Sequence, residues 1–191
     1  MEIVFATNNH HKLEEVRQIL GNNFKLLTLQ DIDFNEEIEE TESTFEGNAL
    51  LKAQIIYEKF KLPCFSDDSG LEVEALDNAP GVYSARYAGD HGNHEKNMDK
   101  LLRELDDKTN RKARFRTILC YINTDGKVNY FNGIINGVIA HERRGMRGFG
   151  YDPVFIPDGY ELSFAEMTPG EKNKISHRAL AVQELLKHLQ K

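Results

Sequence analysis

The sequence predicts an α/β protein, because strand-like and helix-like stretches alternate along the chain. An apolar run at residues 2–6 leads through a polar loop into a helical repeat that reaches Leu20. Residues 45–60 carry apolar side chains at helical spacing, and residues 114–140 have the pattern of a long hairpin. The 191 residues suffice for a single domain with a sizeable core, which has room to divide into two lobes around a cleft.

Composition excludes several classes of function. A net charge of -7 argues against binding of polymeric nucleic acid, which requires a broad basic surface. No apolar stretch approaches ~18 residues and the start of the chain has no signal-like pattern, so we expect no membrane span and no targeting segment. Cys64 and Cys120 lie inside apolar runs without metal-ligand spacing. We therefore expect buried, reduced thiols in a cytoplasmic protein.

The loop at residues 7–12 joins the first strand to the first helix. Such a junction presents backbone N–H groups and the positive end of the helix dipole to an anion, and Lys12 adds a full charge. Asparagine-rich turns also cap helices that bind no ligand, and the loop has neither a Walker nor a Rossmann glycine pattern. The loop alone leaves both interpretations open.

An acidic segment, residues 35–42, follows a predicted second strand at residues 25–28 and is typical of a solvated face. Thr44 then caps the helix of residues 45–60. Asn48 and Lys52 follow at intervals of four, so they share a polar flank with Thr44. That flank faces either water or a cleft.

The stretch Phe65-Ser66-Asp67-Asp68-Ser69-Gly70 is the centre of the functional prediction. Residues 62–65 read as a strand, and Ser69-Gly70 predicts a sharp turn at its end. Neighbouring side chains of a regular strand point to opposite faces, so Asp67 and Asp68 share a cation only if the backbone turns between them. Two carboxylates this close repel each other unless a metal or a basic group neutralises them. An acidic strand-to-turn junction without a ligand is the alternative.

The middle of the chain predicts a strand at residues 71–73, a turn at 78–81 and a helix marked by the apolar residues between Met98 and Leu105. His91 and His94 lie in or beside a polar loop without the helical spacing of a metal site, so we interpret them as solvated.

Residues 142–153 form a locally basic, glycine-rich loop with three arginines, three glycines and the aromatic residues Phe149 and Tyr151. Aromatic rings stack on nucleotide bases, and arginines attract phosphates. The alternative is a connection whose aromatic rings fill the core.

The C-terminal part predicts two helices. Residues 168–171 have the form of a capping box with Pro169 at the first helical position. Ser176 is expected to cap the last helix, which places His177 and Arg178 in its first turn. Cations there oppose the helix dipole at a cost of up to ~1 kcal/mol, so we expect them to serve an anionic or oxo-bearing ligand.

Together and in this order, the motifs resemble those of the inosine/xanthosine triphosphate pyrophosphatases, which hydrolyse non-canonical purine nucleoside triphosphates to the monophosphate and pyrophosphate. The resemblance implies a mixed, twisted sheet flanked by helices, with two lobes around a central nucleotide-binding cleft. It also implies magnesium dependence and a homodimer. The matching pieces are residues 7–9 with Lys12, 39–41 with 44–45 and 48–49, 66–71, 80–87, 149–153, and Lys172 with 175–178.

By resemblance, Glu40 and Asp68 hold Mg²⁺, and Asp67 joins through water. Asp68 also activates the water that attacks the α-phosphorus. Lys12, Lys52, Lys172 and Arg86 are the candidates to neutralise the triphosphate. The residues implied in substrate binding are Thr7, Asn8, Asn9, Lys12, Lys52, Ser69, Phe149, Gly150, Tyr151, Asp152, Lys172, His177 and Arg178.

The resemblance also implies how the base is selected. Phe149 and Tyr151 provide the surface on which the base stacks, and polar residues lie at the edge of the base. Donors aimed at a 6-oxo group accept hypoxanthine or xanthine and mismatch the amino group of adenine. His11 stands where the family often has glycine, so His10 and His11 are not assigned.

Two other functions are compatible with parts of this pattern. A non-catalytic nucleotide sensor would bind the same nucleotides without turnover. A phosphatase of the haloacid-dehalogenase kind would release orthophosphate first, although residues 67–70 lack the spaced Asp-x-Asp of its nucleophile motif.

Overall fold

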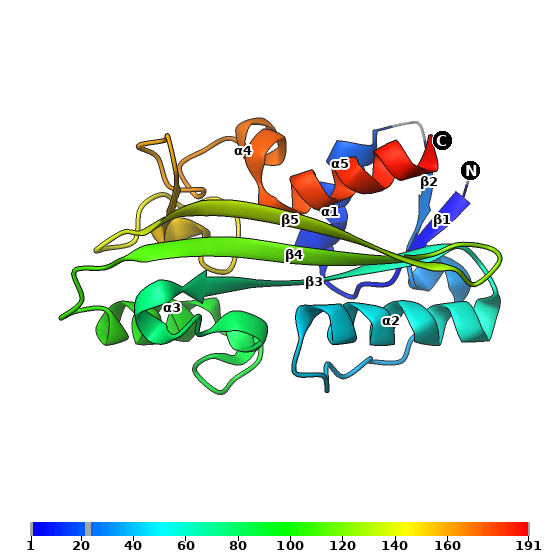
Figure 1. The fold of residues 1–191 in the computed structure, drawn as a ribbon, viewed down its shortest axis with the longest axis horizontal. Helices are drawn as coiled ribbons and strands as arrows, with labels where there is room; N and C mark the ends of the chain where they lie inside the picture. Colours follow the sequence, from blue (N-terminus) through cyan, green and yellow to red (C-terminus); the bar gives the residue numbers. More distant parts are fainter. Residues whose placement is uncertain (1, 22–23, 191) are drawn as a thin grey trace. The chain divides into compact units, whose positions relative to one another are not determined.

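The computed structural model describes residues 2–21 and 24–190, in which helices and strands combine as the predicted α/β class requires (Figure 1). The strands are β1 (Glu2–Phe5), β2 (Lys25–Leu27), β3 (Cys64–Val73), β4 (Lys112–Ile122), β5 (Val128–Ile139) and β6 (Phe155–Pro157). The α-helices are α1 (His10–Leu20), α2 (Phe45–Phe60), α3 (His94–Glu104), α4 (Pro169–Ile175) and α5 (His177–Leu189). The 3₁₀ helices are η1 (Gln30–Ile32), η2 (Glu74–Leu76), η3 (Gly81–Arg86) and η4 (Asp152–Val154).

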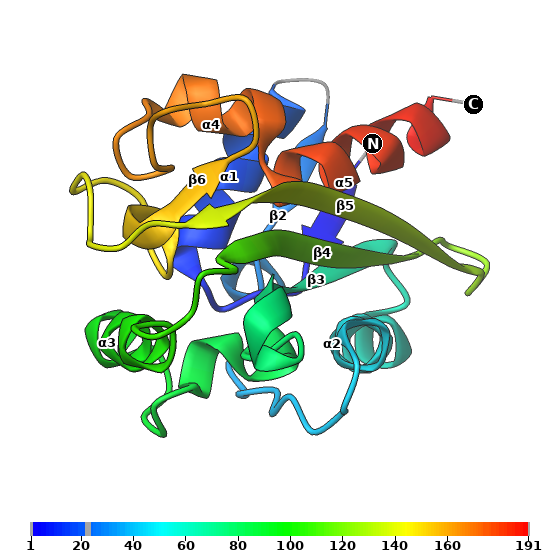
Figure 2. The ribbon, with the colours of Figure 1, turned by 60° about the vertical axis from the view of Figure 1, so that its left-hand side comes forward.

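The strands form one six-stranded sheet in the order β2-β1-β3-β4-β5-β6. The sheet is mixed, as the sequence motifs implied, because β1 pairs in parallel with β2 and β3 while β5 and β6 are antiparallel. In the β1–β3 register Phe5 lies beside Phe65, and their rings stack with centroids 4.5 Å apart. Helices flank the sheet (Figure 2).

The chain divides into two compact units, each assembled from separate segments. The assignment of residues 1–191 to a single functional domain stays a prediction. Unit 1 consists of Met1–Asp68, Thr117–Gly133 and Arg178–Lys191, and unit 2 consists of Ser69–Arg116 and Ile134–His177.

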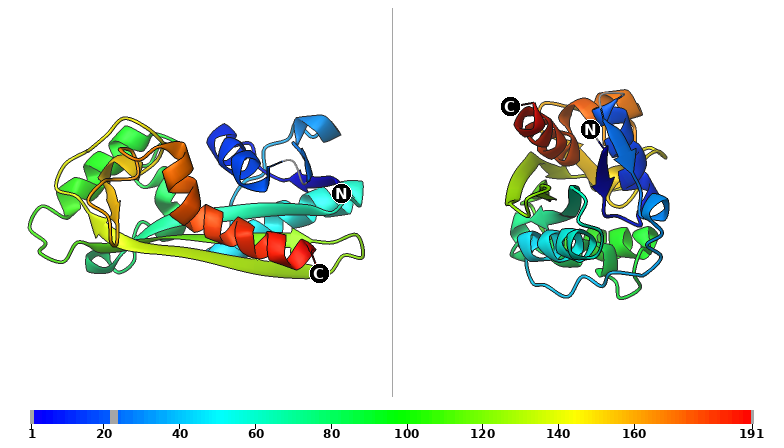
Figure 3. Two further views of the ribbon diagram at one scale, coloured as in Figure 1. Left: turned by 90° about the horizontal axis from the view of Figure 1, so that it is seen from above. Right: turned by 90° about the vertical axis from the view of Figure 1, so that its right-hand side faces the viewer.

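In unit 1 the helices lie on both faces of the sheet. Helices α1 and α5 cover one face, and α2 covers the other (Figures 2 and 3). The helical repeat predicted to reach Leu20 is confirmed as α1, in which Val16 and Leu20 are buried. They pack against Phe65 and Leu185 in the core beneath α1 and α5. Both faces of β3 are therefore covered in this unit.

The core of unit 2 is rich in aromatic side chains. Phe115 packs edge-on against Phe155, with ring centroids 4.7 Å apart, and both contact Phe164. Leu101 of α3 is fully buried in the same core. The predicted amphipathic helix is thus confirmed as α3, with its apolar face against the sheet.

Strand β3 differs from its prediction. The sequence predicted a turn at Ser69-Gly70, and this prediction is wrong because the strand runs unbroken from Cys64 to Val73. β3 lies inside the sheet between β1 and β4, and the pairing of an interior strand overrides the local preference of Ser-Gly for a turn.

Two of the predicted helix caps are confirmed. Thr44 accepts a hydrogen bond from the backbone N–H of Gly47, and Thr168 and Glu171 form the reciprocal capping box at α4. Among the described residues, no helix combines the length and the apolar character needed to cross a bilayer.

Both cysteines are completely buried in unit 1, as the sequence predicted. Burial raises the pKa of each thiol to about 12. Since the thiolate is the reactive form, we expect neither Cys64 nor Cys120 to react with an aromatic disulfide reagent at pH 8 in the native protein. Both should react after denaturation, as followed by release of the coloured thiol. Rapid reaction without denaturant would contradict this burial.

Candidate functional site

A group of buried and partly buried charged side chains, together with Asn48, surrounds β3 in unit 1, and we call it the charged cluster. Asp67 is 2 % exposed and Asp68 is 4 % exposed, so each carboxylate must find its partners inside the protein. The cluster consists of Lys12, Glu15, Glu40, Asn48, Lys52, Asp67, Asp68 and Arg178.

Asp67 points to the face of β3 that α1 and α5 cover. Lys12 of α1 donates to its Oδ1 at 3.1 Å, and Nε of Arg178, from α5, donates to its Oδ2 at 3.0 Å. Burial opposes ionisation of Asp67, but the positive charges of Lys12, Arg178 and Lys52 outweigh it and hold the pKa of this carboxyl below its ordinary value. Asp67 is therefore a fixed negative charge with dedicated partners.

Asp68 points to the opposite face of β3, where α2 lies. Asn48 of α2 donates from Nδ2 to Asp68 Oδ2 at 3.0 Å. Because β3 continues without a turn, the two adjacent carboxylates cannot be directed at one shared cation in the way that the predicted turn would allow.

Lys52 joins the two sides of the charged cluster. Its Nζ donates to the backbone carbonyl of Asp67 at 2.7 Å and forms an ion pair with Glu40. Burial raises the pKa of the Asp68 carboxyl and the charge of Glu40 raises it further, although Lys52 and Lys12 act against both effects. The Coulombic influence of Glu40 on Asp68 means that these two carboxylates repel each other.

The pair Glu40 and Asp68 fits a Mg²⁺ ion by its chemistry. Mg²⁺ prefers carboxylate oxygens and is commonly bound through one or two carboxylates together with phosphates and water. A divalent cation would also relieve the repulsion between Glu40 and Asp68. Within residues 2–21 and 24–190 there is no group of three or more His, Cys, Asp or Glu side chains arranged to hold a metal ion, and two carboxylates are what the prediction requires.

The loop before α1 is ordered by its own side chains. Asn9 caps α1 by accepting from the Lys12 backbone N–H at 3.1 Å, and the Thr7 hydroxyl accepts from the Asn9 backbone N–H at 3.2 Å. Asn8 is exposed. These contacts are those of a helix cap, and they place the side chain of Lys12 at the charged cluster.

Arg178 is 2 % exposed in the first turn of α5. Besides Asp67, it pairs through Nη1 with Glu15 of α1. The expected unfavourable cation at this helix N-terminus is thus balanced by two carboxylates of the same chain. Burial disfavours the charged guanidinium, yet Asp67 and Glu15 raise the pKa of Arg178 above its ordinary value.

A second polar group lies in unit 2. Lys172 of α4 donates to Asp152 Oδ2 at 2.6 Å, and both side chains are almost fully buried. The same oxygen accepts from the Phe149 backbone N–H at 2.9 Å. The ammonium also lies over the Phe149 ring, 5.1 Å from its centroid. Lys172, Asp152 and Phe149 therefore form one unit, which we call the Lys172 group.

Glycine is required at Gly148 beside this group. Its φ is +73°, and a Cβ at this position would lie 2.0 Å from Asp152 Oδ2. Gly150 also has a positive φ, of +63°, but its Cβ position is open. Gly148 is therefore required both by its backbone conformation and by its contact with Asp152, whereas Gly150 is required by its backbone conformation alone.

The remaining predicted residues of unit 2 lie in different environments. Phe149 is partly exposed, whereas Tyr151 is 4 % exposed and donates its hydroxyl to the carbonyl of Ser84 at 2.8 Å. His177 is buried and stacks on Phe115 with ring centroids 4.6 Å apart. Ser69 is partly exposed within β3. Of the two predicted stacking rings, only Phe149 has an exposed surface.

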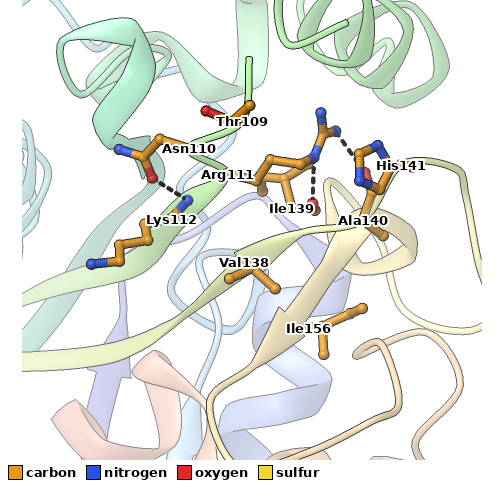
Figure 4. A pocket seen from close by; sticks show the side chains of 9 residues that line it. All are labelled: Thr109, Asn110, Arg111, Lys112, Val138, Ile139, Ala140, His141 and Ile156. Carbon is orange, nitrogen blue, oxygen red and sulfur yellow. Dashed lines mark hydrogen bonds between the residues drawn. The ribbon is translucent and has the colours of Figure 1, made fainter. Parts of the chain in front are cut away.

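A hollow of about 640 Å³ in unit 2 contains none of the predicted residues (Figure 4). Arg111 lines it, but its three guanidinium nitrogens donate at 2.8 Å each to the carbonyls of Leu105, Ile139 and Ala140. Arg111 thus links the start of β4 to the end of β5, and its guanidinium donors form hydrogen bonds within the protein.

Comparison with known proteins identifies the family of this chain. The Ham1 family model matches residues 3–188. The chain belongs to the Ham1 family. A relative from Porphyromonas gingivalis, named dITP/XTP pyrophosphatase, is 55% identical over 96% of this chain and 95% of its own. A relative of the same name from Christiangramia forsetii is 49% identical over the full length of both chains.

A solved structure from the family has the same fold. The solved structure of the Ham1 protein of Staphylococcus aureus matches with a TM-score of 0.90 and 37% identity, over 100% of this chain and 98% of that one. The resemblance drawn from the ordered sequence motifs is thereby confirmed. The roles of individual residues stay predictions, because these comparisons concern whole chains.

Sequence reasoning missed several buried polar contacts of this Ham1 chain. Glu15 pairs with Arg178 across 163 positions of sequence, and only its place three residues after Lys12 on the same helix hinted at it. Asn48 was noted on the polar flank of α2 but was not assigned to Asp68. Asn97 of α3, which is 1 % exposed, gave no sequence signal beyond its position on an amphipathic helix.

We expect Glu15→Gln to lower the free energy of unfolding by about 1–3 kcal/mol, because it removes one of the two carboxylates that balance buried Arg178. Glu14→Gln is the matched control, since Glu14 is exposed on the same helix, and its effect should stay within about 0.5 kcal/mol. Urea unfolding measures both. Equal effects of the two variants would show that the Glu15–Arg178 pair adds no stability.

Gly148→Ala should lower the free energy of unfolding by at least about 1–2 kcal/mol, because alanine is strained at positive φ and its Cβ would collide with Asp152. The control is Gly170→Ala in α4, where nothing lies within 4 Å of the added Cβ. That variant should be neutral or slightly stabilising, as alanine favours helices. Thermal denaturation with matching values for both variants would refute the proposed collision.

Proposed function

We propose that this protein hydrolyses the non-canonical purine nucleoside triphosphates ITP, dITP and XTP to the nucleoside monophosphate and pyrophosphate. The observation that carries the proposal is the charged cluster, in which buried Asp68 and partly buried Glu40 lie close to lysines. The names of the full-length relatives support the same reaction.

The charged cluster is assigned to the triphosphate. Lys12 and Lys52 supply positive charge, and the N-terminus of α1 with Thr7, Asn8 and Asn9 supplies polar groups for phosphate oxygens. A triphosphate carries about four negative charges, so local cations are needed in a chain whose net charge is -7. Arg86 of η3 is a further candidate for phosphate contact.

Glu40 and Asp68 would hold Mg²⁺, which would neutralise phosphate charge during the reaction. Asp68 orients and deprotonates the water that attacks the α-phosphorus, with pyrophosphate as the leaving group. Asn48 holds Asp68 in place through its 3.0 Å hydrogen bond. Lys52 holds the side chain of Glu40 through their ion pair.

The Lys172 group is assigned to the base. Phe149 offers a partly exposed ring for stacking, and Tyr151 supports the loop from within the core. Lys172, Asp152, His177 and Arg178 are assigned to the polar edge that selects a 6-oxo purine, while Ser69 and Gly150 contact the nucleotide. The cleft between two lobes, the homodimer and a cytoplasmic location stay predictions.

The deciding experiment incubates the protein with Mg²⁺ and a panel of purine triphosphates and separates the products by ion exchange. We expect ITP, dITP and XTP to yield monophosphate and pyrophosphate in a reaction that chelation of Mg²⁺ abolishes. Orthophosphate as the first product would indicate a phosphatase. Tight binding without any turnover would indicate a nucleotide sensor.

Asp68→Asn should lower kcat for ITP by ~10²–10⁴-fold, because it removes the proposed base while keeping the shape of the side chain. The control Asp158→Asn makes the same chemical change at an exposed position after β6 and should leave kcat unchanged. Circular dichroism checks that both variants are folded. Undiminished turnover by Asp68→Asn would remove Asp68 from its assigned role.

A further inference from the structure

Asn97 of α3 binds the backbone at the end of η3 with its whole carboxamide. Its Oδ1 accepts from the Ala88 backbone N–H at 2.7 Å, and its Nδ2 donates to the carbonyls of Ser84 and Ala85 at 3.3 and 3.1 Å. The side chain is 1 % exposed, so water does not replace these bonds. One buried residue therefore satisfies three backbone groups on both sides of Arg86.

The segment that Asn97 holds has little regular structure of its own. η3 is a 3₁₀ helix of six residues, and its last carbonyls have no partner within the helix. Lys100, one turn further along α3, donates to the Tyr87 carbonyl at 2.8 Å and lies over the Tyr87 ring. The polar side of α3 thus fixes the chain from Ser84 to Ala88.

The Ser84 carbonyl also connects η3 to the glycine-rich loop. This carbonyl oxygen accepts one hydrogen bond from the Tyr151 hydroxyl at 2.8 Å and another from Asn97 Nδ2. The two bonds use both lone pairs of the oxygen. The Ser84 hydroxyl donates to the Gly81 carbonyl at 2.6 Å and accepts from the Leu71 backbone N–H at 2.9 Å. A shift of Ser84 would therefore disturb Tyr151 as well as η3.

Arg86 is the functional candidate inside this held segment. Its guanidinium lies over the Tyr83 ring, 5.2 Å from the centroid, and the residue is partly exposed. Its backbone lies between two groups that Asn97 binds, the Ala85 carbonyl and the Ala88 N–H. Asn97 therefore holds the backbone from which the Arg86 side chain projects.

We propose that Asn97 is a positioning residue for nucleotide hydrolysis, which holds Arg86 in the orientation that contacts phosphate. This inference rests on the proposed function and adds a residue that does not itself touch the substrate. It requires both ends of the carboxamide, since Oδ1 accepts one hydrogen bond and Nδ2 donates two. An aspartate side chain at this position would keep the shape but lose both N–H donors, so the substitution Asn97→Asp is the first test.

The experiment is a double-mutant cycle of Asn97→Asp with Arg86→Ala, read as kcat/KM for ITP. We expect Asn97→Asp alone to lower kcat/KM on the order of 10²-fold, as misplacement of a binding group does. In the Arg86→Ala background the same substitution should change kcat/KM by less than about twofold, because the residue through which it acts is gone. Multiplicative losses would show that Asn97 supports only the fold.

Controls separate the possible failures. Asn136→Asp, on an exposed position of β5 in the same unit, should leave kcat/KM unchanged. If Asn97→Asp fails to fold, Asn97→Ala replaces it in the cycle, because it does not bury a charge. Hydrogen exchange of the Ala88 amide gives a readout independent of turnover and should become faster in Asn97→Ala, which removes the acceptor Oδ1. A wild-type protein without turnover would overturn the proposed function, whereas an active wild type with a multiplicative cycle overturns this inference alone.

Discussion

The contact of Asp67 with Lys12 and Arg178 is the interaction on which the rest of unit 1 depends. It fixes a carboxylate of the interior strand β3 between α1 and α5, and it accounts for the burial of Asp67 and Arg178 beside the partly buried Lys12. Burying one of these charges without the others would cost several kcal/mol. Once Asp67 is fixed on one face of β3, its neighbour Asp68 must point to the other, toward α2.

The charged cluster and the Lys172 group follow the same physical rule. A buried charge needs both an opposite charge and hydrogen bonds. In unit 1, Arg178 has two carboxylates, and Lys52 has Glu40 and a backbone carbonyl. In unit 2, Lys172 has Asp152. Side chains that are already paired and oriented lose little conformational entropy when an anionic ligand replaces one of their partners. This arrangement suits a nucleotide-binding protein.

Much of the fold was predictable from local sequence. Thr44 and the box of Thr168 and Glu171 are caps that act over three residues, so their sequence signals were sufficient. The path of β3 was not predictable, because Ser69-Gly70 locally favours a turn while strand pairing decides the outcome. The same limit explains why the pairing of Glu15 with Arg178 and the bonds of Asn97 to η3 were missed, since each depends on tertiary contact.

The alternation of Asp67 and Asp68 across β3 makes the strand intolerant of changes in length. Loss of one residue before Asp67 would reverse the faces of everything that follows, so Asp68 would turn toward the arginine and lysine that now hold Asp67. Natural insertions and deletions in this family should therefore avoid Cys64–Val73 and gather in the connecting loops.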